Sequence, residues 1–248
     1  MASLVAVAGC GASPTAPAAP PEMSSLASSS CSSAIISGDP NVSSPARCVR
    51  FSGYEWIVKS SAQFGPGPNV WGDGPDNVWV DAQGMHLTIR NVGGVWMASE
   101  VILNGSLGYG TYMFHTRDHG EPLDPNAMVG LFTYNYADAA FAHREIDMEF
   151  SSPVGGALGA RGQFAVQPYE VPGNTYGFDA AGSSAHSFNW RRDGLTFQSG
   201  NEVWVYPGQN LPARGGENVR MNLWLVGGRS PASGRPVEIV ITSFDWHP

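Results

Sequence analysis

Through most of the chain, short apolar runs alternate with clusters of turn-forming residues. Residues 65–68 read Gly-Pro-Gly-Pro and residues 73–75 read Asp-Gly-Pro. Gly and Pro separate strands because they fit the backbone conformations that turns require. Between such clusters hydrophobic and polar positions often alternate, as in residues 85–91, where Leu87 and Ile89 are flanked by polar side chains. Successive side chains of a strand point to opposite faces, so a period of two predicts half-buried strands.

This pattern predicts an all-β chain. The expected strands are 77–81, 85–91, 95–103, 109–116, 127–135, 143–150, 161–168, 185–190, 194–198, 202–206, 220–226 and 236–246. No stretch predicts a helix of three turns, because Gly or Pro interrupts nearly every candidate. No Gly-rich phosphate-binding motif follows a strand, which argues against an α/β nucleotide-binding fold. We therefore expect a β-sandwich of two antiparallel sheets.

The amino-acid composition supports the predicted β-rich fold and excludes some classes of ligand. The 248 residues include 31 Gly and 19 Pro, and only 14% are charged, which favours turns and short strands over helices. With 21 acidic against 13 basic side chains, the formal net charge is −8. A surface of that sign does not neutralise phosphates, so nucleic acid and anionic membranes are poor partners and a neutral ligand fits better. The length suits one large domain.

The first 46 residues have a different composition from the rest. They contain 12 Ser, 10 Ala and 6 Pro, and few side chains that can build a core. We therefore predict a linker over residues 10–46, preceded by a possible signal segment over residues 1–9, and a globular domain over residues 47–248. No apolar run approaches the roughly 20 residues that a membrane-spanning helix needs.

The segment Val7-Ala8-Gly9-Cys10 resembles the lipobox of bacterial lipoprotein signals. The resemblance implies that Cys10 carries lipid, which would make the chain a secreted or cell-surface lipoprotein with a lipid anchor to the membrane through Cys10. The alternative is a plain unanchored N-terminus. If lipid occupies Cys10, then Cys31 and Cys48 remain as a pair, either as a disulfide in an oxidising compartment or as two free thiols. No zinc-binding spacing occurs, so no metal or other cofactor is expected.

Three acidic residues carry the candidate chemistry. Residues 143–150 alternate as a strand, and Glu145, Asp147 and Glu149 share one face while the other face is apolar. Like charges in line on one strand face repel each other, so a purely structural sheet avoids them. The Cα atoms of the outer two lie roughly 13 Å apart on a strand, and leaning side chains bring their carboxyl groups to about 5–6 Å.

That separation is close to the roughly 5–5.5 Å at which a retaining glycosidase holds its two carboxylates. Asp147, lying between them, would hydrogen-bond one glutamate and couple their titrations, which keeps one carboxyl protonated while the other is an anion. Two other readings remain open at this point. An acidic strand face can simply be solvated, or it can bind a hard cation such as calcium.

Residues 145–150, Glu-Ile-Asp-Met-Glu-Phe, resemble the signature of glycoside hydrolase family 16, the jelly-roll β-glucanases. Further segments similar to that family are residues 108–112, 186–190, 221–224 and 236–238, so the resemblance spans about residues 51–246. It implies a concanavalin A-like jelly roll. The uninterrupted E-x-D-x-E form looks more like the lichenase and xyloglucan-transferase branches than the laminarinase and agarase branches.

The resemblance also implies roles for single residues. Glu145 looks like the nucleophile, Glu149 like the general acid and base, and Asp147 like the assisting carboxylate. The candidate substrate-binding residues are Asn69, Glu100, His143, Gln167, Asn222 and Trp224. His143 stands where the lichenase pattern usually has Trp, and Trp224 would stack on a sugar ring if it faces the cleft.

The resulting hypothesis is an exported, monomeric hydrolase that cleaves internal β-linkages of a polysaccharide with retention and without a cofactor. A transglycosylase would use the same residues if an oligosaccharide replaces water as acceptor. A lectin-like module that binds sugar without cleaving it is a rival of another class, because fold alone does not settle function.

Overall fold

The structure is a computed structural model, and it describes residues 29–31, 39–40, 42, 45–117, 122–152 and 159–248. The predicted signal segment over residues 1–9, the lipidation site Cys10 and most of the predicted linker lie outside the described residues. In the described part, no helix has the length and apolar character needed to cross a bilayer.

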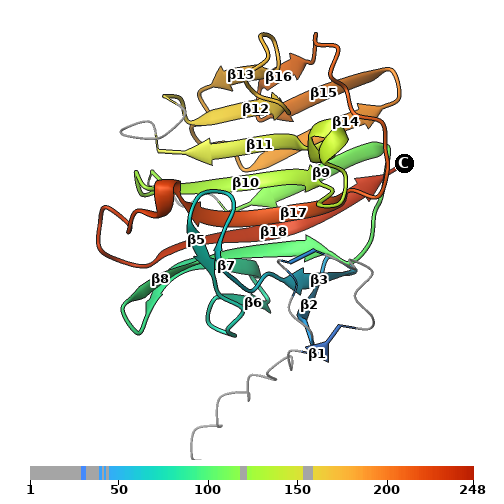
Figure 1. The fold of residues 1–248 in the computed structure, drawn as a ribbon. Coiled ribbons are helices and arrows are strands. Elements are labelled where there is room, and N and C mark those ends of the chain that lie inside the picture. Colours follow the sequence, from blue (N-terminus) through green and yellow to red (C-terminus); the bar gives the residue numbers. More distant parts are fainter. Residues whose placement is uncertain (1–28, 32–38, 41, 43–44, 118–121, 153–158) are drawn as a thin grey trace, which may run out of the picture.

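The described residues form two antiparallel sheets (Figure 1). The first has the order β1 (Ser29–Ser30), β2 (Arg47–Phe51), β3 (Tyr54–Val58), β8 (Val95–Leu103), β17 (Asn218–Leu225), β10 (Ala127–Tyr134), β11 (Ile146–Ser151), β12 (Gly162–Val166) and β13 (Thr175–Phe178). The second has the order β6 (Val78–Asp81), β7 (Gly84–Val92), β18 (Val237–His247), β9 (Gly110–Thr116), β14 (Ala185–Arg191), β15 (Gly194–Ser199) and β16 (Glu202–Val205).

Three smaller features complete the architecture. The long β7–β8 hairpin joins the two sheets, because β7 pairs with β18 of the second sheet and β8 pairs with β17 of the first. The short strands β4 (Ser61–Phe64) and β5 (Asn69–Trp71) form a hairpin whose second strand runs parallel to β8. Two 3-10 helices complete the chain: η1 (Ala139–Arg144) connects β10 to β11 within the first sheet, and η2 (Val226–Gly228) lies in the connection from β17 to β18 of the second sheet.

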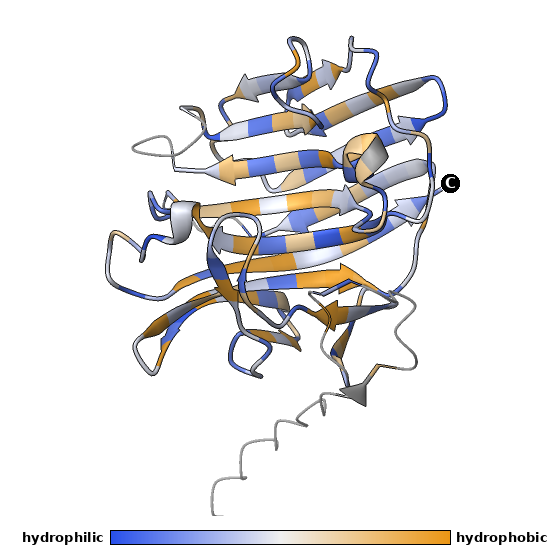
Figure 2. Cartoon of the chain, viewed as in Figure 1, coloured by the Kyte–Doolittle hydropathy of each residue, from blue (hydrophilic) through white to orange (hydrophobic). Residues whose placement is uncertain are grey.

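Aromatic side chains fill the space between the two sheets. Trp56 of β3 meets Phe244 of β18 edge to face at 5.2 Å, and Phe164 of β12 stacks on Phe197 of β15 at 4.9 Å. All four side chains are completely buried. Figure 2 shows polar and hydrophobic bands alternating along β17 and β11, as expected for strands with one face in this core. The predicted all-β jelly-roll sandwich is therefore confirmed.

The predicted strand over residues 143–150 needs a correction at its start. β11 begins at Ile146, and residues 142–144 have left-handed backbone conformations at the end of η1, with φ of 58° at His143. The strand alternation therefore does not extend to His143. The sequence pattern also missed β2 to β5 and β13, which are three to five residues long and too short for alternation to show.

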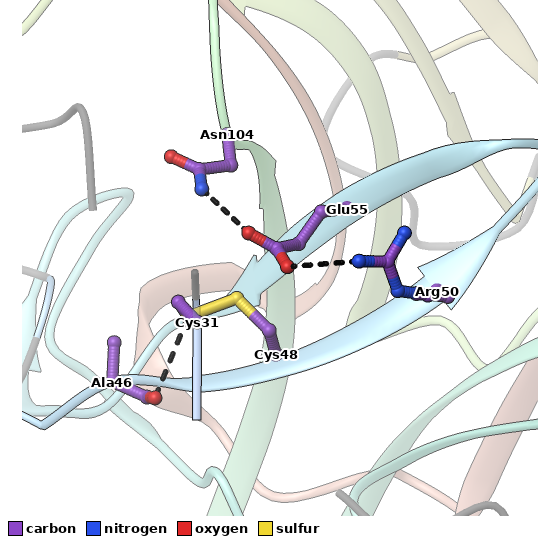
Figure 3. Close-up of a disulfide and its surroundings, with 6 residues drawn as sticks. All are labelled: Cys31, Ala46, Cys48, Arg50, Glu55 and Asn104. Carbon is purple, nitrogen blue, oxygen red and sulfur yellow. Dashed lines mark hydrogen bonds and ion pairs between the residues drawn. A yellow bond between two sulfur atoms is a disulfide. The ribbon is translucent and has the colours of Figure 1, made fainter. Parts of the chain in front are cut away.

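Of the predicted linker over residues 10–46, the structure describes residues 29–31, 39–40, 42 and 45–46, and these residues make contacts with the domain. β1 pairs with β2, and Cys31 forms a disulfide with Cys48 next to the β2–β3 hairpin (Figure 3). The Asp39 side chain is 1% exposed and forms an ion pair with Arg220 on the first sheet. Parts of the segment that composition assigned to the linker therefore pack on the domain.

Candidate active site

The three acidic residues of the β11 region meet in one cavity. The cavity has a volume of about 260 Å³. It is lined by Glu145, Asp147 and Glu149, by side chains of β10 and β17, and by Tyr136, which lies between β10 and η1. β10 lies between β11 and β17 in the sheet (Figure 1). Ile146 and Met148 are completely buried in the core on the other face of β11. The alternation of this strand thus separates its chemistry from its packing.

Strand register builds a polar row across the floor of this cavity. Gly130 of β10 pairs with Glu149 of β11 on one side and with Asn222 of β17 on the other, and Asn222 pairs in turn with Glu100 of β8. A Cβ atom on Gly130 would lie 2.5 Å from the Asn222 Oδ1 atom. A larger residue at position 130 would therefore displace the Asn222 side chain, which occupies the space above this glycine.

Glu145 reaches the same cavity from the connection before β11. Its backbone is extended, with φ of −87° and ψ of 123°, and its N–H donates to the carbonyl of Ala142 at 3.3 Å. Its own carbonyl accepts from the N–H of Gln167 at 3.2 Å. The Thr133 hydroxyl donates to the carbonyl of Arg144 at 2.9 Å. These bonds fix the backbone on both sides of Glu145 and so fix the start of its side chain.

Asp147 lies between the two glutamates in the sequence and lines the same cavity. It is 4% exposed, and its Oδ2 atom accepts a hydrogen bond from the Gln167 amide at 2.9 Å. Burial and the charges of Glu145 and Glu149 raise the pKa of Asp147 well above its usual value. A hydrogen bond between Asp147 and Glu145 raises the pKa of Asp147 and lowers the pKa of Glu145. Asp147 is therefore the protonated donor, and Glu145 is the acceptor.

Burial also changes the titration of both glutamates. It raises the pKa of Glu145 to about 8, with a further contribution from the charge of Glu149, and it raises the pKa of Glu149 to about 7. The charge of Arg220 acts in the opposite direction on Glu145. Because two carboxylates in one dry site do not ionise independently, the pair holds a shared proton near neutral pH.

A chain of buried ion pairs lies beside these carboxylates. Arg220 contacts Glu100 at 3.1 Å and Asp39 at 2.6 Å, and Glu100 contacts Lys59 at 2.9 Å. Each of these side chains is at most 3% exposed. The guanidinium of Arg220 also lies over the ring of Tyr134, 4.8 Å from its centre. The positive charge nearest to Glu145 is thus held in place from several sides.

The predicted substrate-binding residues divide into two groups. Glu100, Asn222 and Trp224 line the cavity. Both oxygens of the Glu100 carboxylate face partners, Oε1 facing Arg220 and Oε2 facing Lys59 and Asn222. The Asn222 Oδ1 atom is buried without a hydrogen-bond partner among the described residues, so this acceptor is left unsatisfied beside the cavity.

Asn69, His143 and Gln167 are not among the residues that line the cavity. The Asn69 amide exchanges two hydrogen bonds with the backbone of Leu225, at 2.9 and 3.0 Å. The His143 ring stacks on Tyr134 with centroids 4.6 Å apart. These side chains hold the walls of the cavity, as Gln167 holds Asp147.

Sequence reasoning missed Lys59, Arg220, Tyr134 and Asp39. A signal existed for Arg220, because residues 220, 222 and 224 alternate on β17 and share the face that carries Asn222 and Trp224. No local pattern marked the other three. In the part of the chain that the structure describes, no group of three or more His, Cys, Asp and Glu side chains is arranged to hold a metal ion.

A larger cavity of about 1080 Å³ lies elsewhere, between β10 and β11 of the first sheet and β14 and β18 of the second. It contains none of the three carboxylates. His186 in its wall is 5% exposed, and burial lowers the pKa of this histidine to about 4, so the ring is neutral at neutral pH. We therefore place the candidate chemistry in the smaller cavity.

No family model and no curated protein matches this chain. Solved structures do match its fold. A native glycosidic hydrolase aligns with a TM-score of 0.59 and 24% identity, covering 78% of this chain and 90% of the other. The β-glucanase of Bacillus licheniformis aligns with a TM-score of 0.59 and 20% identity, covering 78% and 92%. The chain has the jelly-roll fold of these enzymes.

A third structure, the Bacteroides ovatus mixed linkage glucan GH16 in complex with a G4G4G3G product, aligns with a TM-score of 0.61 and 14% identity, covering 77% of this chain and 94% of the other. The chain thus spans most of the length of each of these proteins. All three identities are below 25%, so the likeness establishes the fold, and the chemistry has to be argued from the site.

Proposed function

We propose that this protein is a glycoside hydrolase of family 16 that cleaves internal β-linkages of a glucan with net retention. The observation that carries the proposal is the convergence of Glu145, Asp147 and Glu149 in one cavity of a jelly roll, with a proton shared between them. Double displacement at an anomeric carbon requires two carboxyl groups, one protonated to act as the acid and one ionised to act as the nucleophile.

In the first step, Glu149 protonates the glycosidic oxygen while the Glu145 carboxylate attacks the anomeric carbon. The glycosidic C–O bond breaks, the leaving sugar takes the proton, and a glycosyl ester forms on Glu145. In the second step, Glu149 removes a proton from water, and the resulting hydroxide displaces Glu145 from the anomeric carbon. The second inversion restores the original configuration.

The roles of the two glutamates follow from the groups around them. By their pKa values alone, Glu149 would ionise before Glu145, because the charge of Glu149 adds to the effect of burial in raising the pKa of Glu145. That order already includes the hydrogen bond from Asp147 and the charge of Arg220, which both favour the anion on Glu145, and it also includes the repulsion from an ionised Glu149, which is absent when Glu149 is protonated as the acid. Neither that hydrogen bond nor the charge of Arg220 acts on Glu149, whose pKa is raised by burial. We therefore assign the nucleophile to Glu145 from these contacts.

The walls of the cavity support a neutral sugar as ligand. Phe132, Tyr134, Tyr136 and Trp224 line it, and aromatic faces stack on the apolar faces of sugar rings. Together with Asn222 they offer stacking and one amide acceptor rather than a surplus of positive charge. The similar structures include β-glucanases and a complex with a glucan oligosaccharide, so we propose a β-glucan as substrate class.

Reducing-sugar release tests this function directly. The panel contains β-1,3-, mixed-linkage β-1,3-1,4- and β-1,4-glucans, xyloglucan and galactans. We expect release from at least one β-glucan, with the first product in the β configuration by proton NMR before it mutarotates. An added oligosaccharide acceptor distinguishes a transglycosylase, which would form longer products. Binding of a glucan with no release from any polymer would favour the lectin-like alternative and contradict the proposal.

The shared proton predicts a bell-shaped pH profile for kcat/KM. Below about pH 7 both glutamates are protonated and no nucleophile is available, whereas above about pH 8 both are ionised and no acid remains. We therefore expect the maximum between these values. In Glu149→Gln the group whose ionisation causes the fall above about pH 8 is gone, so the alkaline limb should disappear, while the acid limb, where Glu145 ionises beside a neutral partner, should stay near its wild-type position. An acid limb near the ordinary glutamate pKa in the wild type would contradict the raised pKa values.

A further inference from the structure

The N-terminal arm, by which we mean the described residues 29–31, 39–40, 42 and 45–46, is attached to the domain at several points. β1 pairs with β2, and the Cys31–Cys48 disulfide joins the arm covalently to β2 (Figure 3). Val42 packs on a small buried cluster that includes Ile57 and Ile102. These contacts keep the arm beside the first sheet and bring its acidic residue, Asp39, next to β17.

Asp39 ends the chain of buried charges beside the active site. Its Oδ2 atom lies 2.6 Å from the Nη2 atom of Arg220, and Arg220 uses Nη1 to contact Glu100 at 3.1 Å. With Lys59 on the far side of Glu100, two anions alternate with two cations, and the formal charge of the group is zero. Arg220 is therefore oriented by two carboxylates, one from β8 and one from the arm.

Arg220 is also the cation that faces the reacting groups. It lines the cavity that contains the three carboxylates, and its charge lowers the pKa of Glu145. The charged and titratable groups acting on Glu145 are Glu149, Arg220, Asp147 and Glu100, and the charge of Glu145 acts in turn on Tyr134. The charge of Asp39 is felt at Tyr134 as well, where it raises the pKa of the phenol. The arm thus contacts the cation, Arg220, whose charge acts on Glu145.

We propose that Asp39 is a positioning residue of the active site, supplied by the N-terminal arm, which fixes the Arg220 guanidinium next to Glu145. The inference rests on the proposed function and adds to it that the arm is part of the catalytic apparatus. The disulfide keeps Asp39 within reach of Arg220 by limiting how far the arm can move away. A chain that begins at the predicted domain boundary, residue 47, would lack this contact.

Removing Asp39 has two separable effects. Asp39→Ala takes away one of the two carboxylates that orient Arg220, and small displacements near a reacting centre cost roughly ten- to a hundred-fold in rate. We therefore expect kcat to fall by about that factor in Asp39→Ala, with a smaller change in KM. Asp39→Asn keeps an acceptor for Arg220 but leaves the group with one net positive charge, so the acid limb of the pH profile should move to lower pH.

The test uses the full-length chain and follows kcat, KM and the pH profile together with Tm for the wild type, Asp39→Ala and Asp39→Asn. Asp39→Asn should recover much of the kcat lost in Asp39→Ala while its acid limb stays displaced. Asp76→Asn is the control, because it removes the carboxylate of an exposed ion pair with Arg90 and should leave all four quantities near the wild-type values.

The disulfide provides an independent route to the same contact. The double variant Cys31→Ser/Cys48→Ser should lower kcat in the direction of Asp39→Ala, and combining it with Asp39→Ala should add little, since both act through one contact. Wild-type kcat and pH profile in both Asp39 variants, with only Tm lowered, would overturn the inference and leave the arm structural. A wild-type enzyme without turnover on any polymer would instead overturn the proposed function, and this inference with it.

Discussion

Replacing Glu145 with Gln is expected to abolish turnover and to leave glucan binding almost unchanged. The amide keeps the size and one acceptor of the side chain but is not a nucleophile, so no glycosyl ester forms. A loss on the order of 10⁴- to 10⁶-fold in kcat is typical when a nucleophile is removed from a catalytic group that works as a unit. Reducing-sugar release measures the loss, and calorimetry with an oligosaccharide measures the binding.

Glu149→Gln is the matched comparison, because the same substitution is made at the other glutamate that lines the same cavity. It should cost about 10²- to 10⁴-fold with a natural glucan, whose leaving oxygen needs a proton. With an aryl glycoside, whose phenolate leaves without protonation, the first step should survive in Glu149→Gln and fail in Glu145→Gln. Equal losses on both substrates in the two variants would contradict the assigned roles, and an active Glu145→Gln enzyme would remove the mechanism.

Much of the sheet framework follows from local pattern. Residues 85–91 alternate and residues 95–103 form an apolar-rich run, and the structure places β7 and β8 over almost the same ranges. Prediction failed where tertiary contacts rather than local pattern determine the conformation. The strand before Ile146 gives way to η1, where Ala142, His143 and Arg144 adopt left-handed conformations that their side chains do not favour.

The candidate site divides in the same way. Glu145, Asp147 and Glu149 are within five residues of each other, so their common location could be read from one strand. The ion-pair chain joins residues 39, 59, 100 and 220, which meet only after four distant segments have folded. Composition gave no sign of the contact that Asp39 makes. A stretch rich in Ser, Ala and Pro predicts no core, but a disulfide, one buried ion pair and the packing of Val42 on a small buried cluster hold parts of it on the domain.

Glu100→Ala is expected to destabilise the protein by about 3–5 kcal/mol, the cost of leaving buried charges without their partner. Glu100 faces two buried cations, Lys59 and Arg220, and is itself 1% exposed. Burial already lowers the pKa of Lys59, and Glu100 is the main group that opposes this effect. Loss of Glu100 should therefore affect Lys59 most, because Lys59 loses its carboxylate partner whereas Arg220 retains its ion pair with Asp39. For a domain of this size the expected fall in Tm is roughly 10 °C.

The double variant Lys59→Met/Glu100→Leu distinguishes the destabilisation caused by leaving one charge without its partner from the net contribution of the intact ion pair to stability. It removes both charges of one ion pair and leaves Arg220 paired with Asp39, so it should recover at least half of the lost stability, because apolar replacements of a buried pair are often neutral. Chemical denaturation measures both variants. If Glu100→Ala kept the wild-type stability and lost only glucan affinity, Glu100 would be a sugar ligand first, and the ion pairs would contribute little to the fold.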